Sequence, residues 1–181
     1  MLRSALLGVV VLATVASLQP ATTAIPLADG GRLVFVHPSS WTGKVGGPSV
    51  GPTLKLQPQD GAPDFRVMIT AIPMAKDGKL TNLDELEQAV RQRAEGMLST
   101  ATQKEVTLAR VDGGQAKGFV YHFTDRNAEQ GPGDYRELNQ GALTVGPCLL
   151  SFTILTHPGD DATVKDALRM LAGASYQAAG R

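Results

Sequence analysis

The chain has 181 residues, of which 43% are hydrophobic and 19% charged, enough apolar material for one domain with a sizeable core. Lysine plus arginine number 17, as do aspartate plus glutamate, so no basic field is available to hold nucleic acid or an anionic membrane surface. The single cysteine, Cys148, excludes an internal disulfide, and its place in the apolar stretch Cys148–Leu155 predicts a small buried side chain.

The first 24 residues have the order of a cleavable secretory signal peptide. Met1–Arg3 form a positive start, Ser4–Leu18 form an uncharged apolar run, and small residues precede the cleavage that we expect after Ala24. The run is shorter than the roughly 20 residues that span a bilayer. No cysteine near the cleavage site is available to carry a lipid. We therefore expect residues 25–181 to form one soluble domain, periplasmic or secreted, without stable membrane insertion after signal removal.

The first part of the mature chain predicts strands joined by turns. Alternating or β-branched residues indicate strands at Arg32–His37, Thr53–Gln57 and Phe65–Ile72. Thr42–Thr53 contains four glycines and two prolines, a composition that predicts a loop or mobile flap. Trp41, directly before it, is expected to anchor the start of the core.

The second part predicts two amphipathic helices separated by strands. Apolar residues recur at intervals of three and four from Leu83 to Ala101, with Asn82 as the capping residue. A second helix is expected after Asp160 or Asp161, and the tail Gln177–Arg181 is expected to fray. The strands between the helices are Glu105–Val111, Ala116–Thr124, Tyr135–Val145 and Cys148–Thr156, joined by glycine-containing turns at residues 112–114 and 146–147. This order predicts an α+β fold, a mostly antiparallel sheet covered by two amphipathic helices.

A family resemblance rests on a small set of these segments. They are the strand and turn Val34–Trp41, the strand Phe65–Ile72 with the helix Leu83–Ala101 after it, the hairpin Val106–Asp125, the strand Leu149–Leu155 and the closing helix. This layout, over nearly all of the mature chain, resembles the Mog1/PsbP-like fold, including the DcrB-like exported bacterial proteins. The resemblance implies a mostly non-enzymatic accessory, assembly or chaperone-like role. It carries no catalytic motif and no metal ligand over to this chain.

No pattern in the sequence indicates catalysis or a cofactor. His37, His122 and His157 are the candidates for acid–base or metal chemistry, but the nearest His–acid pair, His122 and Asp125, is three residues apart and out of phase on a strand. No G-x-S-x-G motif is present. The run Gly43–Gly47 lacks the Ser or Thr after Lys44 that a phosphate-binding loop needs. We predict no catalytic, cofactor-binding or metal residues and no bound cofactor.

Exposed connections carry function more often than strands do, and they define a candidate binding surface. It consists of Trp41 and Lys44 at the glycine-rich segment, together with Arg126 and Asp134 at the ends of a polar loop. The favoured function is an exported non-enzymatic accessory or binding protein of the bacterial cell envelope, engaging a protein partner or small ligand. The alternative is a small exported hydrolase with a His/acid site. Two histidines within hydrogen-bond reach of an acid or serine in one cleft would favour the hydrolase.

Overall fold

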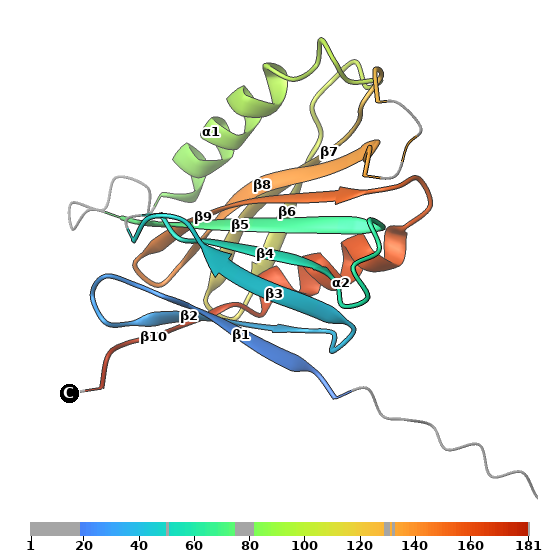
Figure 1. Ribbon diagram of the computed structural model, residues 1–181. Helices are drawn as coiled ribbons and strands as arrows, with labels where there is room; N and C mark the ends of the chain where they lie inside the picture. The colour runs from blue at the N-terminus through green and yellow to red at the C-terminus, as the bar shows by residue number, and fades with distance from the viewer. Residues whose placement is uncertain (1–18, 50, 75–81, 129–130, 132, 181) are drawn as a thin grey trace, which may run out of the picture.

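The computed structural model describes residues 19–49, 51–74, 82–128, 131 and 133–180, so most of the predicted signal peptide, residues 1–18, lies outside the described part. Ten strands and two helices follow one another there (Figure 1). Their bounds are β1 Ala21–Pro26, β2 Arg32–His37, β3 Trp41–Gly46, β4 Thr53–Pro58, β5 Phe65–Pro73, α1 Leu83–Glu95, β6 Leu108–Gly113, β7 Ala116–Thr124, β8 Glu137–Val145, β9 Cys148–Thr156, α2 Asp161–Ala172 and β10 Ser175–Gln177. The strand pairs of this part are antiparallel, which confirms the predicted α+β class.

The larger sheet has seven strands in the order β3-β4-β5-β9-β8-β7-β6. Its middle strand, β9, pairs with β5 on one side and with β8 on the other along its full nine residues. The hairpins β6–β7 and β8–β9 turn at Gly114 and Gly146, whose φ angles of 53° and 55° are left-handed values that glycine adopts without steric cost. The hairpins predicted at these glycines are therefore confirmed.

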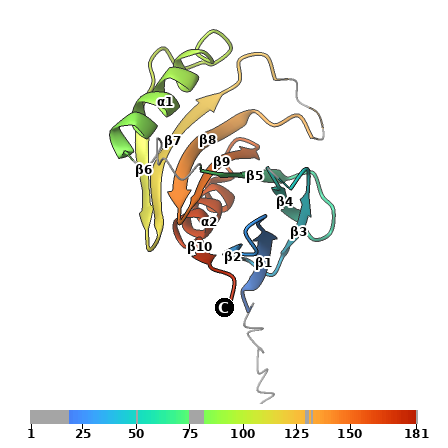
Figure 2. The same cartoon turned by 90° about the vertical axis from the view of Figure 1, so that its left-hand side faces the viewer.

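Different layers cover the two faces of the larger sheet. Side chains alternate along β7, so that Tyr121 and Phe123 pack beneath α1 while Val120 joins the main core. That core lies under α2, which contacts β9 and β6 of the larger sheet and β2 of a smaller sheet, β1-β2-β10. Figure 2 shows the larger sheet curled round α2, with α1 on its outside.

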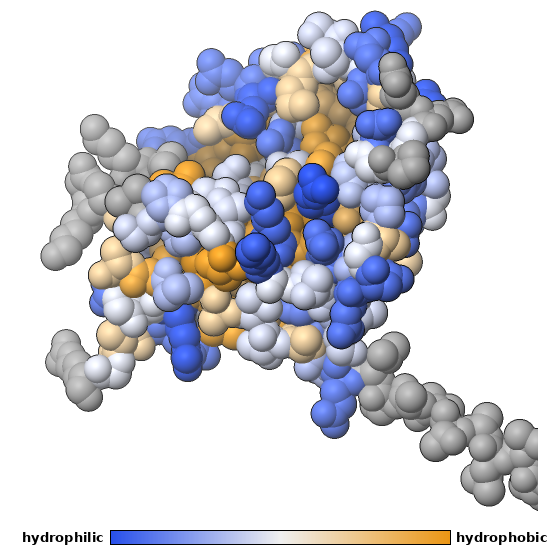
Figure 3. Space-filling view, in the orientation of Figure 1, coloured by the Kyte–Doolittle hydropathy of each residue, from blue (hydrophilic) through white to orange (hydrophobic). Residues whose placement is uncertain are grey.

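α1 leaves part of the outer face of the larger sheet uncovered. Met68 on β5 and Leu155 on β9 are half-buried there, and their register partners Lys55 and Arg66 are exposed. Figure 3 shows apolar surface interrupted by charged side chains on this side of the molecule. This face therefore alternates apolar and basic groups.

The first part of the glycine-rich segment forms a strand rather than the predicted flap, while residues 47–49 and 51–52 lie outside the strands, as expected of a loop. β3 occupies Trp41–Gly46 and pairs with β4 along its whole length. A Cβ on Gly43 would lie 2.8 Å from Thr23 Oγ1 of β1, so this glycine permits a close approach of two strands. Composition alone could not distinguish a glycine needed for tight packing from one needed for a flexible loop.

The first helix is shorter than predicted, because it ends at Glu95 with Gly96 as its C-cap. Met97 and Ala101 still pack against the same cluster through a series of turns, which explains why their apolar spacing indicated a longer helix. The N-cap is Asn82, as predicted, and its side chain accepts a hydrogen bond from the Asp84 amide. The C-terminal segment is also more ordered than expected, since Gln177 belongs to β10 and accepts a hydrogen bond from Arg32.

Gly141 in the middle of β8 provides a test of the sheet packing. A Cβ there would lie 2.0 Å from the Phe119 carbonyl oxygen and 2.8 Å from the Phe152 ring. We expect Gly141→Ala to lower the free energy of unfolding by about 3 kcal/mol, measured by urea denaturation. The control is Gly46→Ala, where a Cβ meets nothing within 4 Å. Similar effects of the two substitutions would contradict the described packing.

β1 provides a second test, because it lies where the signal peptide was expected to be cut. Thr23 donates to the ring of His37 at 2.9 Å, and His37 is only 4% exposed. A chain that starts at Ile25 loses this bond and the pairing of Ala21–Ala24 with β2. We expect its free energy of unfolding to be about 2 kcal/mol lower than that of a chain that starts at Gln19. Equal stability of the two chains in urea would show that β1 contributes little.

Candidate functional site

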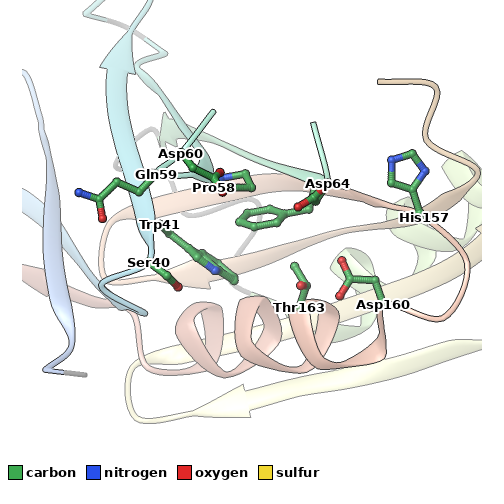
Figure 4. A pocket seen from close by; sticks show the side chains of 10 residues that line it. Ser40, Trp41, Pro58, Gln59, Asp60, Asp64, His157, Asp160 and Thr163 are labelled. Carbon is green, nitrogen blue, oxygen red and sulfur yellow. The ribbon is translucent and has the colours of Figure 1, made fainter. Parts of the chain in front are cut away.

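Two hollows flank the turn between β9 and α2. The aromatic hollow, of about 780 Å³, is lined by Ser40, Trp41, Pro58, Gln59, Asp60, Asp64, Phe65, His157, Asp160 and Thr163 (Figure 4). The polar hollow, of about 430 Å³, is lined by His122, Thr124, Glu137, Asn139, Thr156, His157, Pro158, Gly159, Asp160, Asp161 and Val164. Because His157 and Asp160 line both, we treat the two hollows as one site and call it the α2 groove.

Two aromatic rings form the floor of the aromatic hollow. Trp41 begins β3 after a tight turn in which its amide bonds the Pro38 carbonyl, and Phe65 begins β5. The ring centroids lie 4.6 Å apart at an angle of 46°, and His37 stacks behind the indole at 6.5 Å. The predicted role of Trp41 as an anchor of the core is confirmed, since it is 7% exposed, yet it also reaches the hollow.

Three carboxylates surround the aromatic floor. Figure 4 shows Asp160 projecting from the start of α2, with Asp64 on the opposite side of the hollow. Asp60 accepts a hydrogen bond from the Ala62 amide, and Asp160 is the N-cap of α2 without a side-chain capping bond. Within the described part of the chain none of the three forms an ion pair, and no lysine or arginine lines either hollow. The groove is therefore negatively charged.

The register of the strands places the residues of the polar hollow next to one another. Thr124, Glu137, Thr156 and Phe65 form one row across β7, β8, β9 and β5, and these residues share the inner face of the sheet. His122 Nε2 lies 3.1 Å from Glu137 Oε2, and the Thr124 hydroxyl donates to the same oxygen at 3.0 Å. The start of α2 covers the open end of this row.

Asn139 and Thr156 are buried polar residues of the polar hollow. They are 7% and 1% exposed, and their side chains make no hydrogen bond with the residues that the structure describes. Their polar atoms still open into the hollow, because the one fully enclosed side-chain polar atom without a partner in the described part of the chain is Nε of Arg136. Groups that line a hollow and lack a partner are available to a ligand.

The groove does not have the geometry of a nucleophilic catalyst. Glu137 contacts both Thr124 and His122, so the hydroxyl faces a carboxylate instead of an imidazole base. His157 lines the groove but donates to the Pro63 carbonyl at 3.2 Å. His37 lies outside it, between Thr23 and the Pro38 carbonyl. Thus one histidine of the groove, His122, lies within hydrogen-bond distance of an acid. The hydrolase hypothesis required two histidines in such contacts within one cleft.

The residues of the predicted binding surface do not all lie together. Trp41 lines the aromatic hollow, whereas Lys44, three residues along β3, lines a separate hollow of about 310 Å³ with Lys55 on the outer face. Arg126 donates to the Ala101 carbonyl at 2.6 Å, and Asp134 lies further along the same β7–β8 connection. Binding at these four positions stays a prediction. The sequence indicated neither the acids of the aromatic hollow nor Asn139 as binding residues, and Asp160 was expected only at the start of a helix.

Cys148 is a free, buried cysteine, which confirms the prediction from its apolar surroundings. Burial, with a smaller contribution from the Asp29 charge, raises the pKa of its thiol to about 11. The thiol therefore stays protonated at neutral pH and is a poor nucleophile. Among the described residues, no group of three or more His, Cys, Asp or Glu side chains could hold a metal ion.

These elements and their order define an α+β sandwich of the PsbP-like kind. The solution structure of cyanobacterial PsbP (CyanoP) from Synechocystis sp. PCC 6803 is similar to this chain, with a TM-score of 0.53 and 15% sequence identity over 93% of this chain and 97% of that one. The likeness confirms the predicted PsbP-like fold. No family model and no curated protein sequence matches the chain. Neither helix of the described part is long and apolar enough to cross a membrane.

Thr156 provides a test of the unpartnered groups. Valine has nearly the same shape as threonine but no hydroxyl, so Thr156→Val removes a hydroxyl that opens into the hollow and bonds no described residue. We expect the free energy of unfolding to change by less than about 0.5 kcal/mol in urea denaturation, because no hydrogen bond within the described structure is lost. The matched control is Thr153→Val, which removes the acceptor of the Gln140 amide and should destabilise. A loss of stability in Thr156→Val would show that its hydroxyl already has a partner.

Proposed function

We propose that this protein is a non-enzymatic accessory protein of the bacterial cell envelope that binds a protein partner in the α2 groove. The observation that carries the proposal is the groove itself, which combines an aromatic floor, three carboxylates that pair with no described lysine or arginine, and two polar side chains that open into the polar hollow. Binding sites typically combine apolar walls with a few convergent polar groups. The PsbP-like fold supports the same class of function, because the resemblance drawn from the sequence implies accessory proteins.

Export is the second part of the proposal. The charged, apolar and small segments of residues 1–24 support a signal peptide that delivers the protein to the periplasm or outside the cell. Cleavage after Ala24 would divide β1, so the mass of the mature protein is the direct measurement of the cleavage position. Kinship with the DcrB-like proteins belongs to this proposal and rests on the same export and fold.

The alternative function is a hydrolase that uses His122 and Glu137, which lie 3.1 Å apart inside the groove. It is the weaker candidate, because among the described residues no serine or cysteine lines the polar hollow that holds this pair, and the Thr124 hydroxyl bonds the acid rather than the base. A hydrolase of this design would lose its activity in His122→Asn.

Affinity capture tests the proposed function. The tagged mature protein is incubated with the envelope fraction of its own host, and retained proteins are identified by mass spectrometry. We expect one protein to be retained by the native chain and depleted about tenfold by Asp60→Asn combined with Asp64→Asn, because exposed charges set encounter and specificity. The matched control is Asp84→Asn, which removes an acid from the first turn of α1. Retention of nothing above background would contradict the proposal.

A further inference from the structure

The α2 groove concentrates negative charge in a chain whose formal net charge is zero. Five acids line its two hollows, against no lysine or arginine, and the acids are Asp60, Asp64, Glu137, Asp160 and Asp161. Glu137 is paired with His122, and no other of these acids forms an ion pair with a described residue. Like charges gathered on one surface repel one another, and a bound cation relieves this repulsion.

Part of this charge has a purely structural explanation. Asp160 and Asp161 stand at the start of α2, where acids stabilise the positive end of a helix. Asp60 and Asp64 precede β5 and belong to no helix, so the helix does not explain them. Asp60 bonds the Ala62 amide, and Asp64 forms no side-chain hydrogen bond with the described residues. These two carboxylates are therefore free to receive a cation.

The floor of the aromatic hollow suits the same kind of group. The indole of Trp41 and the ring of Phe65 lie side by side beneath the carboxylates. The face of an aromatic ring attracts an ammonium or guanidinium group, and a planar guanidinium also stacks on it. A basic side chain with an apolar stem would contact rings and carboxylates together.

The polar hollow supplies an independent observation that points to a ligand. Asn139 and Thr156 are more than nine-tenths buried, line this hollow and have no hydrogen-bond partner in the described structure. An asparagine amide both donates and accepts, as the main chain of a peptide does. A ligand that fills both hollows thus carries a cationic side chain and an adjoining amide.

We propose that the α2 groove binds a basic peptide segment of a protein partner. The arginine or lysine side chain of the segment enters the aromatic hollow between Asp60, Asp64 and Asp160, and its main-chain amide bonds Asn139 and Thr156. This inference rests on the proposed binding function and specifies its ligand. A metal ion is a poorer occupant, because the described residues offer no group that could ligate one.

The chain contains one tryptophan, so the fluorescence of Trp41 reports on the groove directly. The probe is a short capped peptide with one arginine among serines and glycines, titrated into the mature protein at low salt. We expect a saturable change in Trp41 emission, and a citrulline-containing copy of the peptide to bind about tenfold more weakly because it lacks the charge.

Two variants separate the proposed contacts from general effects of structure. The double substitution Asp60→Asn and Asp64→Asn should weaken binding of the arginine peptide about five- to tenfold. Asp84→Asn on α1 should leave the affinity for this peptide unchanged. Asn139→Leu should weaken binding with little change in the free energy of unfolding, since the Asn139 amide opens into the hollow and bonds no described residue. A side chain with only a structural role would not give this combination.

Each other outcome overturns the inference. Equal binding of the arginine and citrulline peptides would exclude recognition of a cation, and no binding of either up to about 1 mM would exclude the peptide. A saturable response to calcium or magnesium alone, with none to the peptide, would identify a metal site. If affinity capture retains a partner that the Asp60 and Asp64 substitutions do not affect, the proposed binding function survives and the assignment of its ligand fails.

Discussion

The rest of the molecule depends on the register in which β9 pairs with its two neighbouring strands. This strand pairs in register with β5 and β8 over its whole length, and a shift by one residue would turn every side chain to the other face. Leu150, Phe152 and Ile154 are almost completely buried on the inner face, while Ser151 and Thr153 lie on the outer face. The apolar row fixes the register, and the same register positions Thr156 at the end of the inner face.

The groove exists because β9 continues directly into α2. Only residues 157–160 separate the end of β9 at Thr156 from the start of α2 at Asp161, so the chain returns across the inner face within a short turn. This return separates the aromatic hollow from the polar hollow and adds His157 and Asp160 to both. The site therefore combines residues of β3, β5, β7 and β8 around a single turn. Such a site at the end of a sheet can change its ligand without disturbing the core.

Buried polar groups have different consequences on the two faces. On the outer face Tyr121 donates to Gln140, which in turn donates to Thr153, so a satisfied network links β7, β8 and β9 beneath α1. Burial raises the pKa of the Tyr121 hydroxyl, so it stays protonated as a donor. On the inner face Asn139 and Thr156 bond no described residue, and both line the polar hollow. The first arrangement specifies packing, and the second leaves hydrogen-bonding capacity for a ligand.

The sequence by itself determined the α+β class, the position of most strands and both helices, because period-two and helical patterns and glycine turns are local signals. It also predicted that Cys148 is buried. It did not predict β1 or β10, which are short and gain stability only by pairing with β2. Only the tertiary structure decided the groove, since Asp60, Asn139 and Asp160 lie on separate elements whose approach depends on strand register and on the turn into α2.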